Sequence, residues 1–129
     1  MAQILVADDH KDFRDAVRVL LEQKGHQVLD AEDGVDAVLL CRSHHPDLII
    51  LDVFMPSQNG IEALWHIRNE NRDAKVIVIS AGNGVRTAAW KAETQEVLEL
   101  AEMFGANLVL TKPVEPQALM SAVEATLAS

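Results

Sequence analysis

The chain has 129 residues, of which 49% are apolar, so it can form one domain with one hydrophobic core and leaves no room for a second. Its formal net charge is −9 and no run of Lys or Arg offsets it, which argues against nucleic acid and anionic membranes as partners and favours proteins. The single cysteine, Cys41, excludes an internal disulfide, and we find neither a leader nor a membrane-spanning run. We therefore expect a cytoplasmic protein in which residues 1–129 form a single domain.

Four strong apolar runs and one weaker run predict the strands of a sheet. In chain order the strong runs cover residues 3–7, 47–53, 75–80 and 107–111, and the weaker run covers 26–31. The strong runs are apolar on both alternating faces, which is typical of parallel strands with helices packed on each side. The weaker run suits an edge of the sheet.

Segments with apolar residues three and four positions apart alternate with these strands and predict five helices. The residues of the five apolar stripes are Phe13, Val17, Leu20 and Leu21; Val35, Val38 and Cys41; Ile61, Leu64, Trp65 and Arg68; Trp90, Val97, Ala101 and Phe104; and Leu119, Val123 and Leu127. We expect Trp65 and Trp90 to be packing residues, and Cys41 to be a small apolar residue rather than a reactive thiol. The βα order predicts an α/β fold with a doubly wound sheet.

Polar residues end or follow four of the predicted strands, at the edge where an open α/β sheet binds its ligands. They are Asp8 and Asp9 after the first strand, Asp52 at the third, Ser80 at the fourth and Lys112 after the fifth. Three carboxylates beside one lysine leave an excess of negative charge, which a hard divalent cation such as Mg²⁺ would neutralise. An aspartate beside Mg²⁺ and a lysine can attack phosphorus, because both cations spread the charge on the phosphoryl oxygens. Ser80 could donate to the same oxygens.

Four motifs carry a resemblance to a known family. They are DDH at 8–10, LDVFMPSQNGIE at 51–62, VIVISA at 76–81 and TKP at 111–113. In order and spacing they resemble the receiver domain of two-component response regulators, over essentially the whole chain. The resemblance implies a flavodoxin-like five-stranded sheet in the order 2-1-3-4-5 with five helices. It implies a phosphoacceptor switch that takes a phosphoryl group from a sensor histidine kinase or phosphotransfer protein. The switch then changes its contacts with a downstream protein or output domain.

The resemblance also implies a role for each site residue. Asp52 is the expected phosphoacceptor, Lys112 is expected to pair with the phosphoryl oxygens, and Ser80 is expected to shift toward the phosphoryl group. The implied Mg²⁺ ligands are Asp9 directly, Asp8 chiefly through water, Asp52, and the backbone carbonyl of Phe54. Such a domain is regulatory rather than an enzyme, with Mg²⁺-dependent self-phosphorylation and autodephosphorylation.

Three features depart from the family pattern. Val109 stands where the family often has the Tyr or Phe that turns inward on activation, which leaves only the Ser80 half of the switch. Phe54 is bulky and apolar, and we hypothesise that it shields the acyl phosphate and slows its hydrolysis. The segment 81–106 is longer than usual. It carries an acidic ribbon, either a solvated face or a docking surface for a basic partner, made of Glu93, Glu96, Glu99 and Glu102.

Other readings of the same residues remain open. A small phosphatase with an aspartyl phosphate intermediate would use a D-x-D motif at its first strand, whereas Asp52 is followed by Val53 and Phe54. A receiver-like module that is never phosphorylated is a further alternative. His10 follows the acidic pair and could lean over the site, but we expect it to pack at the start of a helix. No Cys or His cluster has the spacing of a zinc site. The sequence does not reveal the cognate kinase, the stimulus, the output partner, the oligomeric state, or whether the chain acts alone or within a longer protein.

Overall fold

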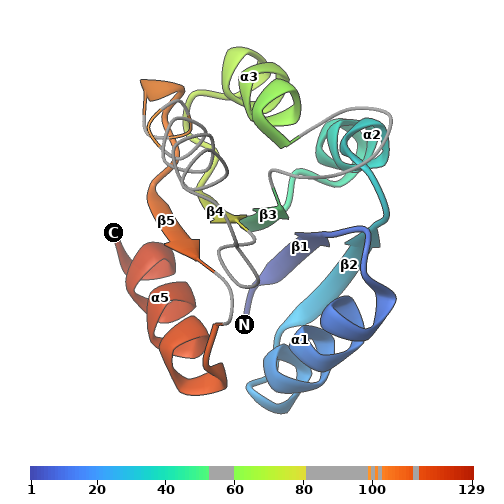
Figure 1. Cartoon of the computed structure of the whole chain (residues 1–129), viewed down its shortest axis with the longest axis vertical. Helices are drawn as coiled ribbons and strands as arrows, with labels where there is room; N and C mark the ends of the chain where they lie inside the picture. Colours follow the sequence, from blue (N-terminus) through green and yellow to red (C-terminus); the bar gives the residue numbers. More distant parts are fainter. Residues whose placement is uncertain (53–59, 81–98, 100, 102, 112–113) are drawn as a thin grey trace, which may run out of the picture.

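A single parallel sheet organises the chain (Figure 1). The computed structural model describes residues 1–52, 60–80, 99, 101, 103–111 and 114–129. Among these residues the strands are β1 (Gln3–Ala7), β2 (Gln27–Ala31), β3 (Leu48–Asp52), β4 (Val76–Ser80) and β5 (Leu108–Thr111). All strand pairs are parallel and the order is β2-β1-β3-β4-β5. The predicted α/β class, the strand order and the place of the weak strand at an edge are confirmed, with bounds that agree to within one residue.

Helices connect the strands and cover both faces of the sheet. Those with bounds in the described part of the chain are α1 (Lys11–Gln23), α2 (Gly34–His44), α3 (Gly60–Glu70) and α5 (Pro116–Ala128). Residues 99, 101 and 103 are also helical, within the stretch where the sequence predicts a fifth helix. The remainder of that prediction, including Trp90, lies outside the described residues.

The side chains of each inner strand divide between two hydrophobic layers. In β1, Ile4 and Val6 join the layer under α1 and α5, while Leu5 and Ala7 join the layer under α2 and α3. Figure 1 shows the two helix pairs on opposite sides of the sheet. Successive side chains of a strand point to opposite faces, so a strand between two helical layers must be apolar throughout. This confirms the prediction made from the doubly apolar runs.

The order of the strands creates a switch point between β1 and β3. The chain leaves β1 toward β2 on one side and then returns to place β3 on the other side of β1. The connections after these two strands therefore diverge at the carboxyl edge, and open α/β sheets bind ligands in the crevice that results. The fold thus directs attention to the residues at the ends of β1 and β3.

The predicted stripe on α3 is wrong by one position. Ala63, Leu64 and Ile67 are buried against the sheet, whereas the Trp65 residue is 52% exposed and lies edge-on to the ring of His66 with centroids 5.0 Å apart. The small Ala63 fits beneath the helix, which turns the bulky indole outward. The expectation that Trp65 packs in the core is therefore incorrect, as is that for Val35, which is exposed on α2.

Candidate functional site at the carboxyl edge of the sheet

The ends of β1 and β3 bring the predicted acidic residues together. Ala7 is in register with Leu51, so the residues that follow them, Asp8 and Asp52, end up side by side. Asp8, Asp9, His10 and Asp52 each offer one possible ligand atom, and these atoms all lie within 4.8 Å of one another. The structure thus confirms that the three aspartates form one cluster.

Two of these carboxylates are buried. The Asp8 residue is 1% exposed and Asp52 is 3% exposed, while Asp9 and His10 face solvent. Removing a carboxylate from water disfavours its charged form, and a second carboxylate nearby disfavours it further. Positive charge placed beside a cluster of this kind therefore stabilises it.

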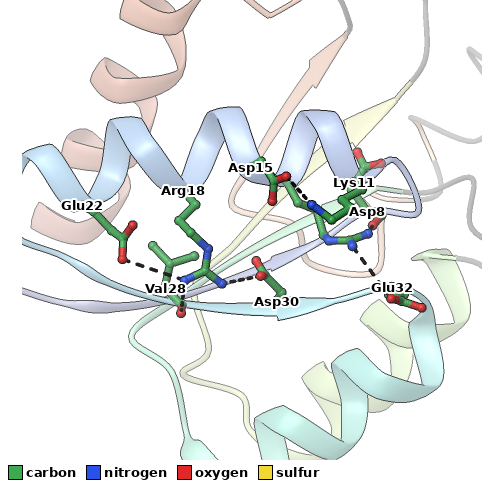
Figure 2. Close-up of polar contacts among 9 residues, drawn as sticks. Asp8, Lys11, Asp15, Arg18, Glu22, Val28, Asp30 and Glu32 are labelled. Atoms are coloured by element: carbon green, nitrogen blue, oxygen red, sulfur yellow. Dashed lines mark hydrogen bonds and ion pairs between the residues drawn. The ribbon is translucent and has the colours of Figure 1, made fainter.

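The residue Arg14 supplies positive charge from the buried side of α1. Its Nη1 donates a hydrogen bond of 2.6 Å to the backbone carbonyl of Asp8, and its Nη2 lies 3.9 Å from Oε1 of Glu32. Figure 2 shows Asp8 and Glu32 in this polar region, with the pair Lys11–Asp15 in the first turns of α1 beside Asp8 and the pair Arg18–Asp30 farther along the helix. Arg14 holds the main chain at the end of β1, and so fixes the start of the acidic pair. The sequence analysis did not identify it, because its position in a helix says nothing of burial.

The ring of His10 lies over the acidic pair. Its Nδ1 is 3.2 Å from Oδ1 of Asp8 and 3.1 Å from Oδ1 of Asp9. The backbone N–H of His10 also donates to Oδ1 of Asp8, at 2.8 Å, so a single carboxylate oxygen contacts both the main chain and the ring of this residue. Of the two places that the sequence left open for His10, over the site or packed at the start of the helix, the structure shows the first. Its place directly after the two aspartates was the signal for it.

The donor set fits a hard divalent cation. Mg²⁺ binds through one or two carboxylates and keeps several water molecules, and Asp8, Asp9 and Asp52 offer carboxylate oxygens within reach of a common point. A bound cation would also meet the electrostatic demand of the two buried carboxylates. The three aspartates therefore fit a hard divalent cation in chemistry and in spacing.

Several predicted site residues are placed only in part. Ser80 ends β4, next to β3, so its main chain reaches the same edge of the sheet, but its side chain is outside what the structure describes. Val109 lies in β5, half-buried against the layer under α2 and α3. Phe54 and Lys112 lie outside the described residues, as do three members of the acidic ribbon; the fourth, Glu99, is helical and exposed.

Two features outside this edge bear on function. Burial raises the pKa of the Cys41 thiol to about 12, so the thiol stays protonated near neutral pH, in agreement with the expected packing role. In the described part of the chain, no helix combines the length and the apolar character needed to cross a membrane.

Comparisons with known proteins point to one family. A family model described as the response regulator receiver domain matches residues 4–124. Protein PilH of Pseudomonas aeruginosa is 36% identical over 128 residues, which are 99% of this chain and 99% of that protein. Chemotaxis protein CheY of Halobacterium salinarum is 30% identical over 125 residues, 97% of this chain and 96% of that one. The crystal structure of a CheY-like receiver domain protein from Methanospirillum hungatei has the same fold, with a TM-score of 0.86 at 22% identity, covering 99% of this chain and 94% of that one.

Proposed function

Because this chain belongs to the receiver domain family of response regulators, we propose that Asp52 is its phosphoacceptor and that residues 1–129 form one receiver domain. At the level of the family, the chain is a regulatory switch of two-component signalling, as the sequence predicted. One observation carries the finer proposal. Asp52 lies buried at the end of β3, at the switch point of the sheet, in one cluster with Asp8 and Asp9.

The proposed chemistry is transfer of a phosphoryl group between two side chains. A carboxylate oxygen of Asp52 forms a bond to phosphorus as the bond from phosphorus to the donor imidazole nitrogen breaks, and that nitrogen keeps the electron pair. The burial of Asp52 supports this role, because a carboxylate held at a dry strand end is already stripped of much of its hydration. The product is an acyl phosphate on the regulator.

We propose a magnesium site next to the acceptor. Asp8, Asp9 and Asp52, with the backbone carbonyl of Phe54, would hold the ion. When bound, Mg²⁺ supplies positive charge that offsets the repulsion between the carboxylates and the incoming phosphoryl oxygens. Lys112 is proposed to pair with those oxygens. The same set of residues supports self-phosphorylation from small phosphodonors and autodephosphorylation.

The output of the switch is proposed to depend on Ser80. Val109 has no ring that could turn between two positions, and it already packs, half-buried, against the layer under α2 and α3. A shift of Ser80 toward the phosphoryl group would then alter the neighbouring surface by itself. Family members work with histidine kinases and output domains, and we assign this chain a sensor kinase or phosphotransfer protein upstream and a protein target downstream, in the cytoplasm. Homodimerisation on phosphorylation is a further option, which sedimentation of the phosphorylated protein would test.

The phosphoacceptor is tested by incubating the protein with acetyl phosphate and Mg²⁺ and measuring its intact mass. We expect one phosphoryl-sized gain in the parent protein and none in Asp52→Asn. Asp73→Asn is the matched control, because Asp73 is an exposed aspartate near the opposite edge of the sheet. A gain that survives in Asp52→Asn, or that never appears in the parent, would refute the assignment and return attention to an unphosphorylated binding module.

The lifetime of the acyl phosphate tests the proposed shielding by Phe54. After removal of acetyl phosphate, the phosphoryl group on the parent protein should decay more slowly than on Phe54→Asn, because the amide would admit and orient water near the phosphorus. The loss of phosphorylated mass with time gives both rates. Equal rates would reject the shielding role and leave the assignment of Asp52 intact.

A further inference from the structure

We propose that His10 is a metal ligand through its ring Nδ1, and that it gives this acidic site a preference for a borderline divalent transition metal, such as Co²⁺, Ni²⁺ or Zn²⁺, over Mg²⁺. The inference rests on the metal site of the proposed function, since the same carboxylates hold the cation. It goes beyond that function because it assigns a nitrogen ligand and a selectivity that oxygen ligands alone do not provide.

The spacing of the ring nitrogen is that of a ligand. Atoms bound to one such ion at about 2.1 Å lie about 3 Å apart when they occupy neighbouring positions. Nδ1 of His10 is 3.1 Å from Oδ1 of Asp9 and 3.2 Å from Oδ1 of Asp8. The ring nitrogen therefore stands at ligand spacing from two carboxylate oxygens. The whole group, with Asp52, spans 4.8 Å, so it must contract by about half an ångström around an ion of this size.

Hydrogen bonds on both sides hold the main chain from which the ring projects. The N–H of His10 donates to Oδ1 of Asp8 at 2.8 Å, and the carbonyl of His10 accepts from the N–H of Arg14 in the first turn of α1 at 3.1 Å. Both ends of the residue are therefore fixed before any ion arrives, which lowers the entropy lost on binding. The side chain is 70% exposed, so it bears little packing load and an ion can reach it from solvent.

The chemistry of the two donor types sets the selectivity. Imidazole nitrogen suits Zn²⁺, Ni²⁺ and related ions, and affinity for a mixed site rises along the first-row series, whereas Mg²⁺ takes oxygen ligands and keeps its water. A nitrogen added to three carboxylates thus strengthens the binding of the first group and leaves Mg²⁺ nearly unaffected. A single histidine lacks the repeated spacing of a zinc motif, so its place after the acidic pair does not by itself predict a nitrogen ligand.

Calorimetric titration of the metal-free protein with Co²⁺ and with Mg²⁺ tests the inference. In His10→Gln the affinity for Co²⁺ should fall at least tenfold, while the affinity for Mg²⁺ should stay within twofold of the parent value. His44→Gln is the matched control, because His44 is an exposed histidine that contacts Ser43 at the end of α2. It should leave the carboxylate-dependent Co²⁺ site unchanged. In the parent, Zn²⁺ should shift the ¹⁵N resonance of His10 Nδ1 rather than that of Nε2.

Two results would overturn the inference. Unchanged Co²⁺ affinity in His10→Gln would show that the ring is not a ligand. Equal changes for Co²⁺ and Mg²⁺ would show that the ring acts only through its charge. Labelling of the parent protein by acetyl phosphate with Mg²⁺ tests the proposed function separately from these titrations. If labelling of the parent fails while the His10-dependent Co²⁺ site remains, the phosphoacceptor assignment falls and the metal ligand stands.

Discussion

Each edge of the sheet carries an arginine that binds main-chain carbonyls, Arg14 buried and Arg68 half-buried, and the two are used differently. At the carboxyl edge Arg14 donates to one backbone carbonyl, that of Asp8, beside a cluster of carboxylates. At the amino edge Arg68 of α3 donates to the carbonyls of Arg72, Ala74 and Gly105 at 2.6 to 2.7 Å. Both guanidinium groups bury an Nε that has no hydrogen-bond partner among the described atoms.

The difference separates an edge whose polar contacts stabilise the fold from an edge whose charges are placed to bind a ligand. Arg68 ties the end of α3 to the turn before β4 and to the residues before β5, and it satisfies carbonyls that helix ends and turns leave open. Burial lowers the pKa of Arg68, but an arginine remains protonated at any ordinary pH. The carboxyl edge instead gathers three carboxylates, an arrangement that costs stability without a cation and gains it with one.

The largest effect is expected at the amino edge, in Arg68→Met. The substitution keeps much of the apolar stem but leaves the three carbonyls without their donor, and hydrogen bonds from a charged donor contribute more than those between neutral groups. We expect the free energy of unfolding to fall by about 3 kcal/mol, measured by urea denaturation. Arg72→Met, at an exposed neighbour that retains its acceptor carbonyl, should cost far less. If both variants lower the free energy of unfolding equally, the hydrogen bonds of Arg68 to the three carbonyls do not specifically stabilise this edge.

Substitution of two glycines distinguishes the cost of main-chain strain from the cost of contact with Arg68. Gly25 has φ +87° and Gly105 has φ +94°, so an alanine at either position must adopt a left-handed conformation. A Cβ at Gly25 would meet nothing within 4 Å, whereas one at Gly105 would lie 3.0 Å from Nε of Arg68. We expect Gly25→Ala to cost about 1 kcal/mol and Gly105→Ala about 2 kcal/mol in urea denaturation. Equal costs would mean that the Arg68 side chain moves aside freely.

At the carboxyl edge the sign of the effect should reverse. Asp8→Asn removes one buried charge from the cluster while its amide oxygen can still accept from the N–H of His10. Without divalent cations and with a chelator present, we expect the free energy of unfolding to rise by about 1 kcal/mol, because like-charge repulsion is relieved. The affinity for Mg²⁺, measured by calorimetry, should fall at least tenfold. Destabilisation in the presence of the chelator would contradict the view that this edge trades stability for binding.

How far the sequence predicts the molecule depends on the kind of residue. Strands such as 3–7 are apolar on both faces, and this pattern has one solution in an α/β fold, so the sheet and the meeting of Asp8, Asp9 and Asp52 follow from it. Rotation of a helix about its axis is less constrained. A small residue such as Ala63 fits the core as well as a large one, and so the stripe on α3 was misplaced.

Contacts that depend on a single side chain follow less directly from the sequence. The ring of His10 joins the acidic cluster because the backbone N–H of His10 donates to one oxygen of Asp8. A bond of this kind does not follow from the periodic pattern of apolar residues. Arg68 was placed in an apolar stripe by its spacing. Its real role, binding carbonyls that come together only in the folded chain, requires knowing that Gly105 lies beside the end of α3.

The smallest effect on stability is expected at Arg42, although its hydrogen bonds to Glu70 are at least as well formed as those of Arg68. The guanidinium of Arg42 binds both carboxylate oxygens of Glu70, through Nε at 2.5 Å and Nη2 at 3.0 Å, and this pairing lowers the pKa of Glu70 below its ordinary value of 4.5. A lowered folded-state pKa stabilises the fold above the unfolded pKa, and this contribution is lost as pH falls through the folded value.

Both side chains are exposed, so solvent screens the pair and fixing it costs entropy. In Glu70→Gln we therefore expect a urea midpoint at pH 7 that is indistinguishable from that of the parent, and the same comparison at pH 3 should show no difference either. If Glu70→Gln loses stability at pH 7 but not at pH 3, an exposed arginine–carboxylate ion pair can stabilise the fold as much as the carbonyl contacts of Arg68. The contrast between the arginines would then reflect geometry rather than burial.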